Sequence, residues 1–436
     1  QFILKKVRIR YTNAQDTAYP ELTRTDAAHT AQITGRGVGV AVVDTGIWAH
    51  PALYYLPDST PRGLVEYDAI LDQVREVAPD YDSDGYGHGT HVASLIASGR
   101  TFQERYNSVA PEARIISVKA FDDTGTGTYM DVIRGIDWVV QHKDAYNIRV
   151  MNLSFSSPPM SHYWDDPLNQ AVMRAWQAGI VVVAAAGNSG PAPMSVGVPG
   201  NVPYVITVGA ITDNYTPDDG SDDYVTPFSG AGPTYEGFIK PDVVAPGAHM
   251  LGLAASNQRL PVEHPENFDG FDYFQMAGTS QATGVVSGIA ALVLQAHPDL
   301  SPDDVKCRIM ATAQAALDEN GALAFSVFQQ GAGLVNGYDA VNATVSGCAN
   351  QGLDVSKDLA GVEHYGGYAN QDADGNYYVM DVNGMTWSGG FTWSGGMTWS
   401  GGMTWSGSTY TWPDVFSGTT GFTWSGNVPL NAPGLG

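Results

Sequence analysis

The sequence predicts an α/β protein with a doubly wound, mostly parallel central sheet and helices on both faces. Three observations lead to this fold class. Apolar, β-branched runs are continuous rather than alternating, which is typical of strands buried on both faces. Segments with helical apolar spacing separate these runs, as in chains of strand-helix-strand units. Glycine-rich or polar turns follow the runs, and right-handed crossovers between them would cover both faces of the sheet.

The first predicted strand spans residues 37–43 and ends at Asp44. The residues before it, up to about 35, are polar and are expected to be irregular. Open α/β sheets place their functional sites at the carboxyl ends of strands, so Asp44 is a candidate site residue. An ordinary turn aspartate at the strand end is the alternative explanation.

A polar, glycine-rich stretch then leads to His88, which is expected to open a helix, with His91 one turn later. Two histidines at this spacing can bind a metal ion. The neighbouring glutamate of an HExxH motif is absent, however, so a packed structural role is favoured for His91.

Further strands are predicted at 114–121, 148–155 and 180–186, and helices near 132–140 and 169–178. The last of these strands leads to Asn188. The stretch 276–282 then runs into the apolar segment 285–294, which predicts a buried helix whose first turn carries Ser280. Free N–H groups at a helix start favour developing negative charge, so Ser280 is well placed for a nucleophile, although a simple helix cap is the alternative.

Composition excludes several classes of protein. The 45 acidic and 21 basic residues give a formal charge of −24, which disfavours electrostatic binding to nucleic acid or to anionic membranes. No uninterrupted apolar run reaches the roughly 18 residues of a membrane span. Cys307 and Cys348 lie 41 residues apart, and one disulfide is favoured over two buried thiols. The start at Gln1, without a signal-peptide pattern, suggests a processed, secreted mature form.

Acyl transfer explains four of these features together. A serine hydroxyl needs a base such as histidine, a carboxylate fixes the imidazole tautomer, and an amide can bind the oxyanion. The motifs Val43-Asp44-Thr45-Gly46, His88-Gly89-Thr90-His91 and Gly278-Thr279-Ser280-Gln281-Ala282 occur in the order Asp, His, Ser. This order, with Asn188 between the second and third motifs, resembles the subtilisin-like serine proteases, the subtilases, over roughly residues 25–345.

The resemblance implies a role for each site residue. Asp44 would orient the base, His88 would be the general base, Ser280 the nucleophile and Asn188 the oxyanion donor. Two extended segments would pair with a peptide by strand addition, as expected of an endopeptidase with broad specificity. The expected substrate-binding residues are Gly125, Thr126, Gly127, Tyr129, Ser154, Phe155, Ser156, Ala185 and Gly187. Neither Ser156 nor Ser189 brings charge to the pocket for the P1 side chain, so apolar or aromatic P1 residues are expected.

Structural calcium is the expected cofactor, and no organic cofactor is expected. The family's familiar calcium site uses an acid soon after the first motif, where residues 50–53 offer none. Carboxylates at alternate positions before a glycine suit calcium elsewhere, with solvated acidic turns as the alternative. The candidate ligands are Asp80, Asp82 and Asp84 in one loop and Asn370, Asp372, Asp374 and Asp381 in another.

We therefore expect an N-terminal arm at 1–24, a peptidase domain at 25–348 and a C-terminal extension at 349–436. The extension is nearly free of basic residues and carries hexapeptide aromatic repeats, such as Met397-Thr398-Trp399-Ser400-Gly401-Gly402, at 385–426. It could pack on the domain as a small β-rich accessory, bind a polymer or surface through its tryptophans, or stay extended and flexible. A protein acting mainly by such binding is the second hypothesis.

Other enzyme classes fit less well. An esterase or lipase would need a Gly-x-Ser-x-Gly elbow, and a sedolisin-type acid peptidase would have a glutamate at the position of His88. The expected partners are protein or peptide substrates and, transiently, the enzyme's own inhibitory pro-segment. A monomer is expected.

Overall fold

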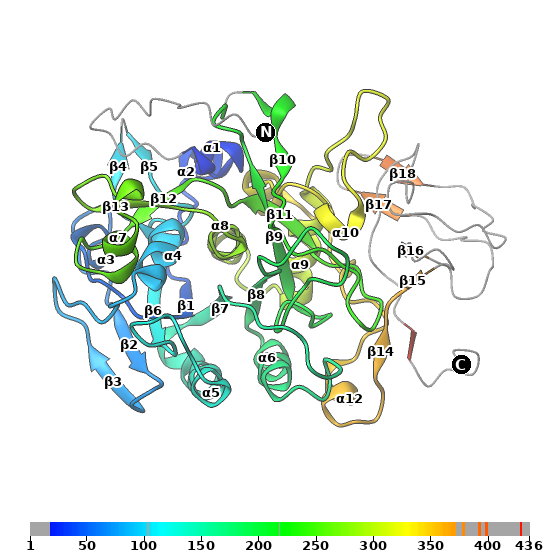
Figure 1. Cartoon of the computed structure of the whole chain (residues 1–436), viewed down its shortest axis with the longest axis horizontal. Helices are drawn as coiled ribbons and strands as arrows, with labels where there is room; N and C mark the ends of the chain where they lie inside the picture. The colour runs from blue at the N-terminus through cyan, green and yellow to red at the C-terminus, as the bar shows by residue number, and fades with distance from the viewer. Residues whose placement is uncertain are drawn as a thin grey trace.

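A nine-stranded sheet forms the centre of the protein (Figure 1). The computed structural model describes residues 18–102, 104–217, 219–371 and 377–379, and three short strands further along the chain. The strands of the main sheet are β1 (Gly39–Asp44), β2 (Val65–Asp68), β3 (Gln73–Glu76), β6 (Arg114–Lys119), β7 (Ile148–Leu153), β8 (Val181–Ala185), β9 (Ile206–Thr212), β10 (Tyr224–Val225) and β11 (Val243–Pro246).

The sheet is mostly parallel. Its main path runs in the order β10-β9-β8-β7-β1-β6-β2-β3, and β11 pairs with β9. Only the pairs at the two ends, β2 with β3 and β9 with β10, are antiparallel. From β1 the chain first adds β2 and β6 on one side and then β7, β8 and β9 on the other, so the winding direction reverses beside β1. Ligand sites of doubly wound sheets form at this reversal, outside the carboxyl ends of the strands.

Helices cover both faces, as predicted. Helices α4 (His88–Ala97) and α8 (Thr279–Ala296) pack against each other on one face, and α5 (Tyr129–Tyr146) and α6 (Pro167–Gln177) do so on the other. Helix α8 has 18 residues, is buried from Thr279 to Leu294 and contacts β7, β8, β9 and β11. The long apolar run of the sequence is therefore the central helix of the fold.

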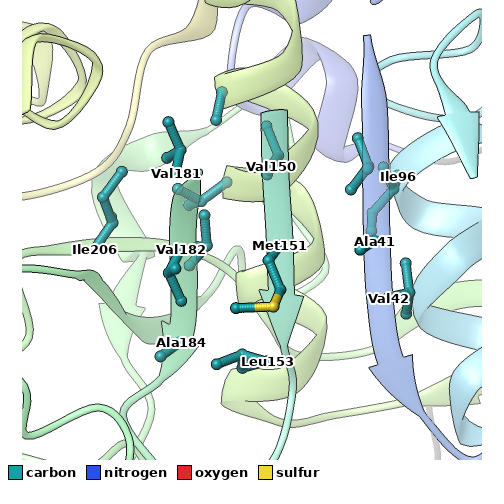
Figure 2. Close-up of a cluster of buried hydrophobic side chains, with 14 of the residues drawn as sticks. Ala41, Val42, Ile96, Val150, Met151, Leu153, Val181, Val182, Ala184 and Ile206 are labelled. Carbon is teal, nitrogen blue, oxygen red and sulfur yellow. The ribbon is translucent and has the colours of Figure 1, made fainter. Parts of the chain in front are cut away.

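Aliphatic side chains from neighbouring strands and from α4 pack around the central strands of the sheet (Figure 2). Because both faces of these strands are covered, consecutive residues are buried, which explains why the sequence shows no alternation. Members with at most 3% exposure include Ala41, Val42, Ile96, Val150, Met151, Leu153, Val181, Val182, Ala184 and Ile206.

The smaller elements surround this core. The short helices are α1 (Tyr19–Leu22), α2 (Thr25–Thr30), α3 (Pro51–Tyr54), α7 (Arg259–Glu263), α9 (Pro302–Thr312), α10 (Val327–Gln330), α11 (Gly337–Asn342) and α12 (Val355–Leu359), with 3₁₀ turns at Gly220–Asp222 and Pro265–Asn267. Paired short strands are β4 (Thr101–Phe102) with β5 (Arg105–Tyr106), β12 (Met250–Leu253) with β13 (Tyr273–Met276), β14 (Tyr365–Gly366) with β19 (Val428–Pro429), β15 (Ala369–Gln371) with β16 (Tyr377–Val379), and β17 (Phe391–Trp393) with β18 (Met397–Trp399).

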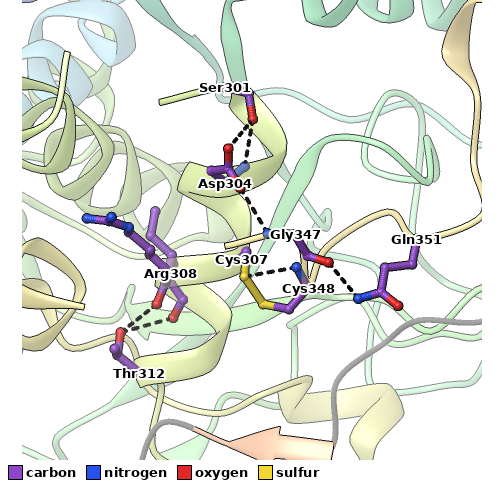
Figure 3. The surroundings of a disulfide bond; sticks show 9 residues. Ser301, Asp304, Cys307, Arg308, Thr312, Gly347, Cys348 and Gln351 are labelled. Carbon is purple, nitrogen blue, oxygen red and sulfur yellow. Dashed lines mark hydrogen bonds between the residues drawn. A yellow bond between two sulfur atoms is a disulfide. The ribbon is translucent and has the colours of Figure 1, made fainter. Parts of the chain in front are cut away.

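The predicted disulfide is confirmed (Figure 3). Cys307 of α9 is bonded to Cys348, with 5.2 Å between their Cα atoms. The N–H of the neighbouring Gly347 also donates to Asp304 Oδ1 at 2.9 Å. The segment after α11 is thereby fixed to α9.

The prediction of an irregular segment up to about residue 35 is wrong for residues 19–30, which form α1 and α2. Tyr19 is buried, and its hydroxyl donates to the carbonyl of Asn107. Tertiary packing thus creates two helices that local composition does not indicate. Most of the aromatic repeats at 385–426 lie outside the described residues, apart from the antiparallel pair β17 and β18. None of the described helices is long and apolar enough to cross a membrane.

Candidate active site

Asp44 and His88 meet where the winding of the sheet reverses. Asp44 is the last residue of β1, and His88 is the first residue of α4. His88 Nδ1 lies 2.7 Å from Asp44 Oδ1, which also accepts the N–H of Thr45 at 2.8 Å. Burial alone would lower the pKa of His88, but the charge of Asp44 and the hydrogen bond to it outweigh burial and raise that pKa. The imidazole therefore carries a proton on Nδ1 and presents Nε2 to its other side.

A buried carboxylate, Asp84, fixes this pair. Its Oδ1 accepts the Thr45 hydroxyl at 2.7 Å, and its Oδ2 accepts the N–H and hydroxyl of Thr90 at 2.8 and 2.7 Å. Thr45 Oγ1 in turn accepts the N–H of Gly89 at 2.8 Å. Asp84 thus ties the end of β1 to the first turn of α4, which sets the spacing between Asp44 and His88.

Ser280 lies in the first turn of α8, as predicted. Its hydroxyl donates to the carbonyl of Ser154 at 2.9 Å, and the Ser154 hydroxyl donates to the Ser280 carbonyl at 2.8 Å. The start of α8 is therefore joined to the chain that leaves β7. A rotation about the Cα–Cβ bond of Ser280 is enough to turn its hydroxyl away from Ser154.

Asn188 follows β8 and faces the same helix start. Its side-chain Oδ1 accepts the N–H of Thr279 at 2.9 Å and the hydroxyl of Thr279 at 3.0 Å. This fixes the orientation of the amide, so its nitrogen is the group available to a ligand. The site thus combines an N–H donor from Asn188 with the N-terminus of an 18-residue helix, where anions bind well.

All four residues line a cavity of about 590 Å³. Of the predicted substrate-binding residues, Gly125, Ser154, Phe155, Ser156, Ala185 and Gly187 also line it. Thr126, Gly127 and Tyr129 are not among the lining residues. The N–H of Thr126 donates to Asp122, and the Tyr129 hydroxyl donates to Asp166 at 3.1 Å.

Ser189, expected beside the P1 pocket, lines the cavity too, as do Thr45 and Thr279 of the sequence motifs. The other lining residues had no sequence signal strong enough to single them out, and they are Tyr86, Phe121, Ser157, Pro158, Pro159, Met194, Ser195 and Gly197. A Cβ atom on Gly187 or on Gly197 would clash with the Ser156 hydroxyl. Both glycines therefore allow the Ser156 hydroxyl to approach the backbone closely in this wall of the cavity. A glycine between two valines, as at Gly197, is the signal that could have indicated this close approach.

His91 has the predicted structural role. It is fully buried, and its Nε2 lies 3.2 and 3.0 Å from the carbonyl oxygens of Met250 and Phe274. Burial, followed by the charge of His88, lowers the pKa of His91 to about 3. His91 is therefore neutral and holds α4 against β12 and β13.

The structure does not gather the first predicted calcium loop into a ligand set. Both carboxylate oxygens of Asp84 accept hydrogen bonds from protein groups, and Asp82 Oδ1 accepts the N–H of Asp84 at 2.9 Å. Asp80 lies in the left-handed backbone region, with φ of 61°. In the part of the chain that the structure describes, no group of three or more His, Cys, Asp or Glu side chains is arranged to hold a metal ion.

The second calcium loop is only partly described. Asn370 belongs to β15, and its Oδ1 accepts the N–H of Gln371 at 2.8 Å. Asp372, Asp374 and Asp381 lie outside the described residues.

Comparison with known proteins places this geometry in a family. A model of the Subtilase family matches residues 35–333. Serine protease AprX from Bacillus subtilis is 39% identical over 348 residues, which cover 77% of this chain and 74% of that protein. Subtilisin DY from Bacillus licheniformis is 31% identical over 317 residues, which cover 72% of this chain and 94% of that protein.

Among solved structures, the chain is similar to fervidolysin from Fervidobacterium pennivorans, described as a keratinolytic enzyme related to subtilisin. The TM-score is 0.58 at 26% identity, over 77% of this chain and 46% of that one. The order of the strands and the position of the site beside β1 are consistent with these similarities. The chain belongs to the subtilase family and is a subtilisin-like serine endopeptidase.

Proposed function

We propose that Ser280 attacks the peptide carbonyl, with His88 as general base and Asp44 as its orienting carboxylate. The observation that carries this proposal is the 2.7 Å contact between Asp44 and His88 Nδ1 in the cavity that also contains Ser280. As the Ser280 oxygen bonds to the carbonyl carbon, its proton passes to His88 Nε2. Asp44 keeps the Nδ1–H tautomer and stabilises the imidazolium.

The negative charge that develops on the former carbonyl oxygen must then be stabilised. We assign the stabilisation of this charge to hydrogen bonds from the Asn188 amide and from the N–H of Ser280 at the start of α8. His88 then gives its proton to the departing amine nitrogen as the peptide C–N bond breaks. In the second half, water attacks the acyl-enzyme, His88 takes the proton of that water and returns it to the Ser280 oxygen.

The preferred substrates have an apolar or aromatic P1 residue. Among the residues that line the cavity, Asp44 and His88 are the ones that can carry charge, and the mechanism uses both. Phe155, Pro158, Pro159 and Met194 supply apolar surface. A lysine or glutamate side chain would lose its hydration there without a counter-charge.

The test of the mechanism is Ser280→Ala, with Ser287→Ala as matched control. Ser287 lies on the same helix, is buried and bonds to Asn152 at 2.9 Å, but it does not line the cavity. Ser280→Ala is expected to lower kcat by about 10⁶-fold and to abolish labelling by a fluorophosphonate, while Ser287→Ala keeps both. Peptide hydrolysis by Ser280→Ala at a rate near that of the control would refute the proposal.

The specificity is tested with tetrapeptide p-nitroanilides that differ only at P1. Phenylalanine and leucine are expected to exceed lysine and glutamate in kcat/KM by at least about tenfold. A lysine or glutamate preference would contradict it.

Secretion, a monomeric state, transient inhibition by a pro-segment and calcium binding by the loop at 370–381 are also part of this proposal. Calcium binding predicts that a chelator lowers Tm and that adding calcium restores it. A binding protein that acts mainly through its aromatic repeats is not favoured, because the matched family is enzymatic.

A further inference from the structure

The chain beyond the matched family region of 35–333 returns to the substrate cavity. After α12 it runs through β14 to the hairpin β15–β16 (Figure 1). The N–H of Gly367 donates to the carbonyl of Glu236 at 2.8 Å, and the N–H of Ala369 donates to that of Gly237 at 3.0 Å. Backbone hydrogen bonds therefore fix this part of the extension to the loop before β11.

A buried carboxylate holds the same segment further upstream. Asp358 of α12 accepts the hydroxyl of Tyr163 at 2.5 Å and that of Tyr204 at 2.9 Å. His364 Nδ1 lies 2.8 Å from its other oxygen. Tyr163 and Tyr204 belong to the matched region, so polar contacts in a buried site connect the extension to it.

The hairpin also has an apolar contact with the domain. Val327 and Phe328 at the start of α10 are buried, with exposures of 1% and 0%. The side chains packed against them include Ala369 of β15 and Tyr377 of β16. The ring of Tyr377 is therefore held by packing, and its hydroxyl has a defined direction.

That hydroxyl lies 2.7 Å from the sulfur of Met194. Met194 lines the cavity together with Ser156 and Gly197. Its backbone has φ of 60°, and the residue is 40% exposed. A methionine side chain has three rotatable bonds and adapts easily, so a contact at its sulfur restricts which conformation faces the cavity.

We propose that Tyr377 is a positioning residue for substrate selection, which fixes the Met194 side chain as the outer wall of the P1 pocket. This inference rests on the proposed function, because it assumes that the part of the cavity beside Ser156 and Gly197 receives the P1 side chain. A fixed wall is preorganised for a large apolar side chain, whereas a small P1 residue does not reach it. The extension thereby contributes to specificity although it lies outside the matched region.

The test is Tyr377→Phe, which keeps the packed ring and removes the hydroxyl. For a peptide with phenylalanine at P1, KM is expected to rise three- to tenfold while kcat stays unchanged. For a peptide with alanine at P1, both KM and kcat are expected to stay unchanged. The matched control is Tyr365→Phe, which removes a hydroxyl from the same segment. Tyr365 bonds to Glu363 at 2.9 Å rather than to Met194, so its variant is expected to match the unmodified enzyme.

Met194→Leu tests whether the effect passes through the sulfur. It is expected to raise KM as Tyr377→Phe does. The double variant is expected to show no further rise in KM, because each substitution removes the same contact between Tyr377 and Met194. Three results would each overturn the inference. The first is that Tyr377→Phe leaves the ratio of KM for the two peptides unchanged, and the second is that the two substitutions act independently in the double variant. The third is that Tyr377→Phe lowers Tm and reduces activity equally on both peptides. Failure of the proposed function is recognised separately, by an unmodified enzyme that prefers charged P1 residues or by an active Ser280→Ala variant.

Discussion

Replacing Asp358 by alanine tests how strongly the extension is attached. In the native protein the carboxylate is fully buried and accepts both tyrosine hydroxyls. Tyr163 and Tyr204 have exposures of 0% and 2%, so water cannot replace the lost acceptor. His364 is 28% exposed at its side chain and can bond to water instead.

The expected loss follows from the two hydroxyls that lose their acceptor; the Tyr163 hydroxyl still accepts the N–H of Tyr365 at 3.3 Å. Each buried hydroxyl that can no longer donate costs about 1–3 kcal/mol, so the pair costs roughly 2–6 kcal/mol. Removing a buried carboxylate also recovers part of its own desolvation cost. We therefore expect Asp358→Ala to lower the free energy of unfolding by about 3 kcal/mol, in the lower half of that range.

The measurement is urea unfolding followed by tryptophan fluorescence, in a Ser280→Ala background that prevents autolysis. Asp354→Ala is the control, because exposed Asp354 caps the same helix by accepting the N–H groups of Ser356 and Lys357. Loss of this cap is expected to cost about 1 kcal/mol. If Asp358→Ala cost no more than the control, the buried carboxylate would not anchor the extension and the reasoning would be wrong.

Three further results are expected. The proposed mechanism needs neutral His88, and the raised pKa of His88 places the acid limb of kcat/KM above pH 6.5. Asp44→Asn should move this limb to lower pH and reduce kcat by about 10⁴-fold, and an unmoved limb in pH-rate profiles would contradict the assignment. The pKa of His91 is lowered to about 3, so this side chain binds fewer protons in the folded than in the unfolded state, and the free energy of unfolding should fall as pH decreases from about 6.5 toward 3. In urea titrations at several pH values, His91→Gln should lose this part of the acid sensitivity. Replacing Cys307 and Cys348 by serine should lower the free energy of unfolding by about 2–4 kcal/mol, because it opens a closed loop of 41 residues; an unchanged urea midpoint would show that the bond adds no stability.

Strands β1, β6, β7 and β8 and the central helix were predictable from local patterns, and the four proposed catalytic residues from those patterns together with the family resemblance, whereas β2, β3, β9, β10 and β11 were not predicted. Continuous apolar runs indicate buried strands, and small residues before an apolar segment indicate the helix start that carries Ser280. Asp44 and Asn188 follow two such strands, so their convergence follows from the parallel order. Observed strand ends differ from the predicted ones by a residue or two, which is the usual uncertainty at element ends.

What escaped prediction depends on partners far away in the chain. The carboxylates before Gly85 have a spacing that suits calcium, but Asp84 instead receives donors from Thr45 and Thr90, which the spacing cannot reveal. Met194 has no local pattern around it, and its place in the cavity is set by the loop between β8 and β9. Likewise, Tyr19 finds its partner at Asn107, so a segment with weak helical propensity becomes ordered.

The central position of α8 has a consequence for biosynthesis. A ribosome makes β1, α4, β7 and β8 first, so Asp44, His88 and Asn188 leave it well before Ser280. Until residues 279–296 emerge, one face of β7, β8 and β9 lacks the helix that covers it, and the sheet cannot bury its aliphatic side chains. The proposed nucleophile therefore joins the site in the same step that covers this face of the sheet. Under the proposed mechanism, a nascent chain gains activity only after that step.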